Sequence, residues 1–125
     1  MAKEQWPDWD VYVQGRCRCV YCGMDGAGSF QVWRQLRIDH LIPKGAGGED
    51  SAANKVVCCV DCNFKKGQFN PRGKAFPGAT WASPPDPAIR LRLIEAVKEQ
   101  IQPKLVEEER DYRTMIEEIT AAMHA

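Results

Sequence analysis

Four of the six cysteines form two Cys-x-x-Cys pairs: Cys19 with Cys22, and Cys59 with Cys62. Each short turn can point two sulfurs at one position, and four thiolates around one ion give the closed tetrahedral geometry of structural zinc. Iron fits the same sulfurs, because ligand softness and geometry alone do not separate the two metals. Cys17 and Cys58 are alternative ligands, but the first choice keeps both spacings at two residues and puts Gly23 directly after the first pair.

A second set of polar residues lies between and just after these pairs. It comprises the adjacent residues Asp39 and His40, then Asn54 and Asn63. A neutral imidazole, with a reference pKa of about 6.5, can accept a proton from water near neutral pH. A carboxylate and an amide oxygen suit a hard cation such as Mg²⁺. These residue types fit hydrolysis of a phosphodiester, which needs an activated water and charge neutralisation on the phosphate.

The order of these motifs resembles that of HNH endonucleases with the ββα-metal fold, in the variety flanked by two Cys-x-x-Cys pairs. The resemblance implies that His40 is the general base and that Asp39 and Asn63 hold a catalytic Mg²⁺ or Mn²⁺. It makes Asn54 the middle motif residue, which helps to fix the loop and so orients the base. The family often has histidine at the third position, where asparagine is a familiar variant, and the only other histidine here is His124.

The resemblance covers roughly residues 17–67 and implies an α+β fold, a small ββα-metal (HNH) core with a structural zinc knuckle. The sequence itself predicts a strand over residues 30–39, which are rich in β-branched and aromatic side chains, and a second short strand over 55–57. A Gly- and Pro-rich loop connects them. A helix is predicted to begin inside the second Cys-x-x-Cys turn and to stop at Gly67.

Strand geometry sets a constraint on the predicted site. Adjacent Asp39 and His40 would point to opposite faces of a regular strand. We therefore expect either that the backbone turns there or that the base and the catalytic cation lie at the end of the strand, where the alternation fails.

Basic residues around the motif are candidates for phosphate contact. The resemblance puts Lys66, in its Cys-Asn-x-x-Lys pattern, near the phosphate backbone. Lys65, Arg37 and Lys44 are further candidates for substrate binding, although a solvated surface explains each of them nearly as well. Residues 1–78 carry 11 Lys and Arg against 8 Asp and Glu, so charge is only a supporting indication of nucleic acid.

The C-terminal part has a different pattern, and we divide the chain into an HNH core with its knuckle (1–78) and a proline-rich connector with a helical extension (79–125). Asp86-Pro87 predicts a helix start, and Pro103 is expected to end that helix, with a second helix over about 104–123. This part carries 6 Lys and Arg against 9 Asp and Glu, so it should not lie on DNA. Its apolar spacing fits a helical hairpin or a homodimer equally well.

Composition limits the remaining classes of protein. With 125 residues, 44% of them hydrophobic, the chain can bury a single core with an appendage. No apolar run reaches the length of a membrane span, and the aromatic first 16 residues read as a short helix or arm packed on the body, without the apolar core of a signal peptide. We therefore expect a soluble, cytoplasmic protein without a disulfide scaffold.

The function predicted from these features is a metal-dependent endonuclease acting on duplex or branched DNA. The alternative is a catalytically inactive zinc-ribbon module that binds nucleic acid or protein. The intact set of Asp39, His40, Asn54 and Asn63 favours the nuclease, since a binding module has no need for it.

Overall fold

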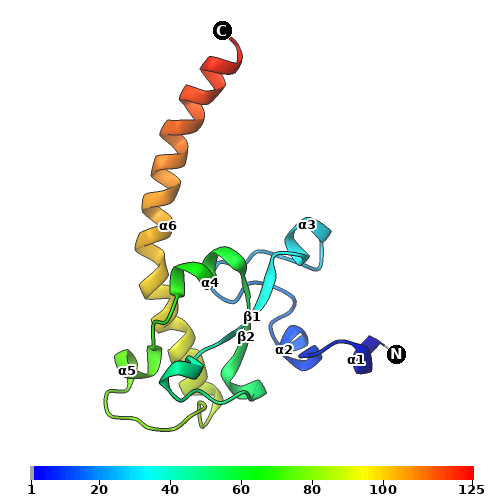
Figure 1. The fold of residues 1–125 in the computed structure, drawn as a ribbon, viewed down its shortest axis with the longest axis vertical. Helices are drawn as coiled ribbons and strands as arrows, with labels where there is room; N and C mark the ends of the chain where they lie inside the picture. Colours follow the sequence, from blue (N-terminus) through cyan, green and yellow to red (C-terminus); the bar gives the residue numbers. More distant parts are fainter. Residues whose placement is uncertain (1) are drawn as a thin grey trace.

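The computed structural model describes residues 2–125, which form a small body and one long helix that projects from it (Figure 1). The α+β class predicted from the sequence is confirmed. The helices and strands are α1 (Ala2–Gln5), α2 (Trp9–Gln14), α3 (Phe30–Trp33), β1 (Leu36–His40), β2 (Lys55–Cys59), α4 (Val60–Lys66), α5 (Pro71–Ala75) and α6 (Pro87–Met123). Two 3₁₀ turns, Lys44–Ala46 and Ala52–Asn54, lie in the loop between the strands. None of the helices in this described range is long and apolar enough to cross a membrane.

The two strands pair antiparallel, from Leu36 opposite Cys59 to His40 opposite Lys55. The prediction of a strand at 55–57 is confirmed, and β2 runs on to Cys59. On its other side β2 receives a hydrogen bond from the first cysteine knuckle, where the Val20 amide donates to the Val57 carbonyl at 2.9 Å. The first knuckle is therefore fixed to the sheet.

The predicted strand over 30–39 is correct only in its second half, because Phe30–Trp33 is a helical turn. The Ser29 hydroxyl caps this turn by accepting a hydrogen bond from the Val32 amide at 3.3 Å. The Trp33 ring also packs on Tyr12 of α2, with ring centroids 5.3 Å apart. The cap and this tertiary contact outweigh the local preference for a strand.

Helix α4 begins and ends as predicted. Cys59 is its N-cap, and Gly67 ends it with a positive φ of 54°, a conformation that glycine adopts without steric cost. The second cysteine knuckle is therefore the transition between β2 and α4, so two of the predicted metal ligands and the predicted motif residue Asn63 share one short segment.

The first half of α6 completes the core. The Asp86 side chain accepts a hydrogen bond from the Ile89 amide at 2.9 Å, and Pro87 follows at the first helical position, as predicted. Leu93, Val97 and Ile101 are fully buried in one cluster with the strands and the knuckles. This part of the extension is thus a structural component of the body.

The prediction that Pro103 separates two helices is wrong, because α6 continues through it to Met123. A proline inside a helix removes one hydrogen bond and costs about 3 kcal/mol. Two contacts just beyond it hold the next turn in line on α4. Lys104 Nζ donates to the Lys65 carbonyl at 2.8 Å, and Lys65 Nζ pairs with Glu108 at 2.8 Å. Neither a hairpin nor a second separate helix forms.

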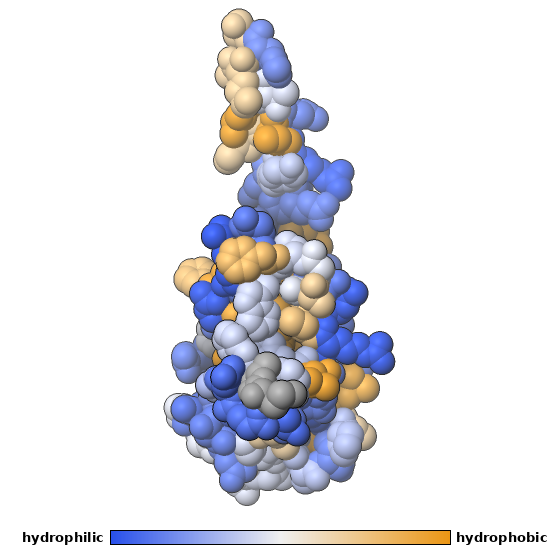
Figure 2. Space-filling model, turned by 90° about the vertical axis from the view of Figure 1, so that its right-hand side faces the viewer, coloured by the Kyte–Doolittle hydropathy of each residue, from blue (hydrophilic) through white to orange (hydrophobic). Residues whose placement is uncertain are grey.

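Beyond these contacts α6 projects away from the body (Figure 1). Apolar side chains lie on the surface of this projecting part (Figure 2). They include Tyr112, Met115, Ile116, Ile119 and Met123, all of which are exposed. At the opposite end of the chain, α1 and α2 form the expected aromatic arm, which is anchored by the buried Val11.

Candidate metal centre and active site

The predicted cysteine quartet comes together in the structure. The sulfurs of Cys19, Cys22, Cys59 and Cys62 all lie within 4.8 Å of one another, so they are positioned to bind one metal ion. The two turns have the same local geometry. In each, the amide of the second cysteine donates to the sulfur of the first at 3.4 Å, and Gly23 supplies the positive φ of 83° that follows the first turn. Hydrogen bonds with Cys22 and Cys62 lower the pKa of Cys19, which favours the thiolate form.

The two alternative ligands lie outside this cluster. Cys58 is fully buried next to Cys59 on β2, and burial raises the pKa of its thiol. Burial also raises the pKa of the Cys17 thiol. The backbone of Cys17 has a positive φ of 54°. Neither sulfur belongs to the group of four that lie within 4.8 Å of one another.

A polar hollow of about 380 Å³ lies where β1 ends against α4. Its walls include Asp39, His40, Asn63 and Lys66. Asp39 and His40 remain in regular strand geometry, yet both reach this hollow because β1 is an edge strand and His40 is its last residue. The backbone thus does not turn away at Asp39, and both side chains line the hollow at the end of β1.

The Asp39 carboxylate is held by two residues from different segments. Tyr21, in the first knuckle, donates from its hydroxyl at 2.8 Å, and Lys66, on α4, lies 3.2 Å away in an ion pair. Tyr21 is buried, and burial together with the neighbouring Asp39 charge raises its pKa well above the usual value, so the hydroxyl stays a donor. Lys66 Nζ also donates to the His40 carbonyl at 2.9 Å. Tyr21 therefore links the metal knuckle directly to the predicted catalytic carboxylate.

The His40 ring is bound from the loop that follows β1. Its Nε2 lies 2.9 Å from an Asp50 carboxylate oxygen, which is also 3.2 Å from Lys55 Nζ. The hydrogen bonds of Asp50 to His40 and then to Lys55 lower the pKa of Asp50 to about 2, so this carboxylate is charged at any pH above about 4. An imidazole held by an acidic partner at one nitrogen has its other nitrogen left to take a proton.

Comparison with known proteins agrees with this geometry. Residues 19–69 match the family model described as HNH endonuclease. We refer to this segment, which is similar to HNH endonucleases, as the HNH domain. No match was found among curated proteins or among solved structures. The matched range of the HNH domain begins at the first cysteine of the quartet and ends just after α4, so it contains both knuckles and every wall residue of the hollow named above.

Within the HNH domain, Asn54 lies completely buried under the loop and outside the hollow. Its side-chain oxygen accepts from the Ile42 amide at 2.9 Å, and its amide donates to the carbonyls of Ile42 and Glu49. Its own carbonyl accepts from the Leu41 amide. Asn54 thus ties the segment after His40 to the segment before Asp50, the two residues that meet across the loop.

The predicted phosphate contacts divide into two groups. Lys44 and Lys66 line the hollow of the HNH domain, although the Lys66 side chain is buried against Asp39. Lys65 lies outside it, paired with Asp61 and Glu108. Arg37 also lies outside it, with its guanidinium donating to the carbonyls of Arg34 and Leu36.

Sequence reasoning missed Tyr21 and Asp50. Tyr21 stands inside the first Cys-x-x-Cys pair, where any residue satisfies the pattern. Asp50 stands in an irregular loop without periodicity. A polar residue inside a metal turn and an acidic residue in a loop bounded by motif residues were the only signals available.

Proposed function

We propose that the protein is a metal-dependent endonuclease that hydrolyses DNA phosphodiester bonds at the hollow beside β1. One observation supports this proposal above all others. Asp39 and His40 come from a strand and Asn63 from a helix, yet all three line a single polar hollow within the HNH domain. A module that only binds its partner has no need to bring a base and two oxygen ligands together.

The residues of the hollow fit a hard divalent cation. Asp39 offers carboxylate oxygens and Asn63 an amide oxygen, which are donors that Mg²⁺ and Mn²⁺ prefer. When bound there, such a cation would neutralise charge on the phosphate. Tyr21 and Lys66 fix the orientation of the Asp39 carboxylate, and Lys66 balances its negative charge in a nearly dry setting.

His40 is assigned the role of general base. With Nε2 donating to Asp50, Nδ1 is the nitrogen that accepts the proton of the attacking water. The Asp50 carboxylate holds the ring in its orientation. Asn54 acts one step further away, because it holds the loop that carries Asp50. We therefore regard Asp50 and Asn54 as positioning residues and His40 as the catalytic one.

The cysteine quartet is assigned to structural zinc. Four sulfurs leave no open position for substrate, which is the arrangement of a structural site. Its role in the reaction is indirect, since it fixes the first knuckle, and with it Tyr21, against β2 and α4. The lysine in the wall best placed for a phosphate is Lys44, which is exposed at the rim of the hollow.

Cleavage by a His40→Ala variant tests the proposal. The wild-type protein should nick or linearise plasmid DNA with Mg²⁺ or Mn²⁺, and the variant should lose about 100-fold or more of this activity, the usual contribution of a general base. Zinc content and thermal stability should be unchanged. His124→Ala is the matched control, because it removes the other histidine at the exposed end of α6.

Two results would contradict the proposal in different ways. Full activity in His40→Ala would remove the assignment of the base. Binding of DNA without cleavage by the wild-type protein, under every divalent cation tried, would favour the alternative of an inactive zinc-ribbon binding module.

A further inference from the structure

An open aromatic cleft of about 770 Å³ lies between the N-terminal arm, α3 and β1. Four aromatic side chains line it, together with Arg16 and Ile38. The rings belong to Trp6, Trp9, Tyr12 and Trp33. Nothing in the mechanism proposed above uses this cleft.

The aromatic rings are arranged for contact with a further flat group. Trp6 is 55% exposed and Trp9 is 37% exposed. Trp6 meets Trp33 edge to face, with planes at 86° and centroids 6.4 Å apart, so the two rings are not stacked face to face. Val11 of α2 is buried in the core, whereas the Trp6 and Trp9 side chains remain exposed to water.

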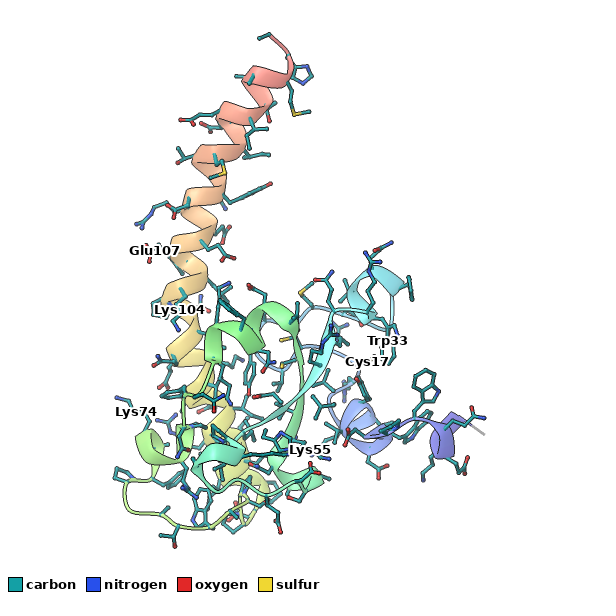
Figure 3. All side chains as sticks on the ribbon, viewed as in Figure 1. Cys17, Trp33, Lys55, Lys74, Lys104 and Glu107 are labelled. Carbon is teal, nitrogen blue, oxygen red and sulfur yellow. The ribbon has the colours of Figure 1, made fainter. Side chains whose placement is uncertain are left out.

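The cleft adjoins the polar hollow at one residue of β1. Ile38, which precedes the catalytic pair on β1, lines both cavities. A chain of polar contacts also joins them. Asp8, in the wall of the cleft, accepts from Lys55 at 2.6 Å, and Lys55 pairs with the Asp50 that holds His40. Figure 3 shows Trp33 next to Cys17 at the cleft, with Lys55 farther along the sheet. The cleft and the hollow are therefore neighbours on the surface of the body.

Charge and ring chemistry favour a nucleobase over an apolar peptide. Asp8 in the wall is neutralised by Lys55, which leaves the exposed Arg16 as the cation of the cleft. Stacked aromatic side chains with an adjacent arginine bind the flat face of any base while the cation attracts the phosphate. An aliphatic peptide side chain would use neither the flat faces nor the guanidinium.

Building on the endonuclease function above, we propose that this aromatic cleft stacks an unpaired nucleobase adjacent to the cleaved phosphate. The preferred substrate is then DNA with unpaired nucleotides, such as a flap, a gap or a branch point, and not a continuous duplex. Bases inside a duplex are stacked on each other and cannot enter the cleft without being extruded.

Binding without cleavage tests this proposal directly. Fluorescently labelled duplexes of one sequence, with and without a single-stranded flap, are titrated with protein in Ca²⁺, which replaces the catalytic cation. The wild-type protein should bind the flap substrate at least about fivefold more tightly than the blunt duplex, the effect of one stacked base. Trp6→Ala and Trp9→Ala should each reduce that preference, and the double variant should abolish it.

Phe30→Ala is the matched control. Phe30 is an exposed ring on α3 that does not line the cleft, so its loss should leave the preference intact. Thermal melting of each variant identifies any that fails to fold. The flap preference can then also be read from quenching of the intrinsic tryptophan fluorescence in the wild-type protein, which requires no substitution.

The outcomes separate this inference from the nuclease function. Equal binding of flap and blunt duplex, or a preference that survives the double variant, overturns the cleft proposal even if the protein cleaves DNA. A change in oligomeric state of the double variant without any change in DNA preference also overturns it, in favour of a protein partner. A tryptophan-dependent flap preference supports it even where no cleavage is found.

Discussion

The body and the outer half of α6 contrast in how their shape is maintained. In the body, the α-helices before α6 have four to seven residues and the two strands have five, and they carry Asp39, His40, Asn63 and Lys66. Such short elements are unstable alone. They persist because the cysteine cluster, the buried side chains of α6 and the polar contacts across the loop connect them. The outer half of α6 is regular and long, yet its side chains are exposed.

This difference teaches that the precision of the site comes from connections between segments. Asp39 is fixed by one residue from the first knuckle and one from α4, and His40 by one from the loop. Among the described residues, the outer half of α6 has one ion pair with the body, between Glu108 and Lys65. Removing a contact should therefore change stability or activity strongly in the body and only slightly in the outer half of α6.

The largest effect is expected for Cys59→Ser. Structural zinc contributes about 10–16 kcal/mol of apparent binding free energy, which is comparable with the whole stability of a small domain. Loss of one ligand should lower the zinc content and unfold the body, as measured by elemental analysis and by circular dichroism. A chelator should have the same effect on the wild-type protein.

Cys58→Ser is the control for that experiment. Cys58 is the buried neighbour of Cys59 but lies outside the quartet, so its zinc stoichiometry should equal that of the wild-type protein. An unchanged zinc content in Cys59→Ser would rule out this ligand set.

A pair of truncations on one helix compares the two regions directly. Leu93→Ala, in the inner half, should lower the free energy of unfolding by about 2–5 kcal/mol, because it leaves a cavity in the core. Ile119→Ala, in the exposed outer half, should change it by less than about 0.5 kcal/mol. Urea denaturation of dilute protein measures both. A similar decrease in the free energy of unfolding for both variants would mean that the outer half of α6 is buried against another molecule in solution.

Asp50→Ala is expected to act on the rate and not on the fold. Loss of the carboxylate should lower kcat about tenfold, equivalent to about 1.4 kcal/mol, with KM and melting temperature unchanged. Asp50→Glu should restore part of the activity, and Glu49→Ala controls for removal of an exposed acidic neighbour. A decrease confined to KM would show that Asp50 acts on substrate binding and not on His40.

The smallest effect concerns association of two copies through the outer half of α6. Its exposed side chains Tyr112, Met115, Ile116 and Ile119 follow helical spacings of three, four and seven residues. We expect weak, concentration-dependent dimerisation in sedimentation experiments, abolished by Ile116→Glu. A single monomeric species for the wild-type protein at all concentrations would contradict it.

Much of the site could be predicted from the sequence, because its chemistry depends on residue types at short, fixed spacings. Two Cys-x-x-Cys pairs, the Asp39-His40 pair and the Asp86-Pro87 helix start depend on local geometry alone. The family match and the convergence of the four sulfurs agree with the first two. The roles of the individual residues in catalysis remain predictions that the variants above address.

Tertiary structure decided what local patterns left open. Contacts of α4 with Lys104 and Glu108 carry α6 through Pro103, and a serine cap with an aromatic contact turns Phe30–Trp33 into a helix. Lys66 is drawn to Asp39 from 27 positions away, and Asp50 reaches His40 across a loop. The sequence by itself determined which groups are present and how each short segment begins, since these depend on neighbouring residues. Only the folded chain determined which charges pair, because the energy of a pair depends on distance and burial in space and not on separation along the chain.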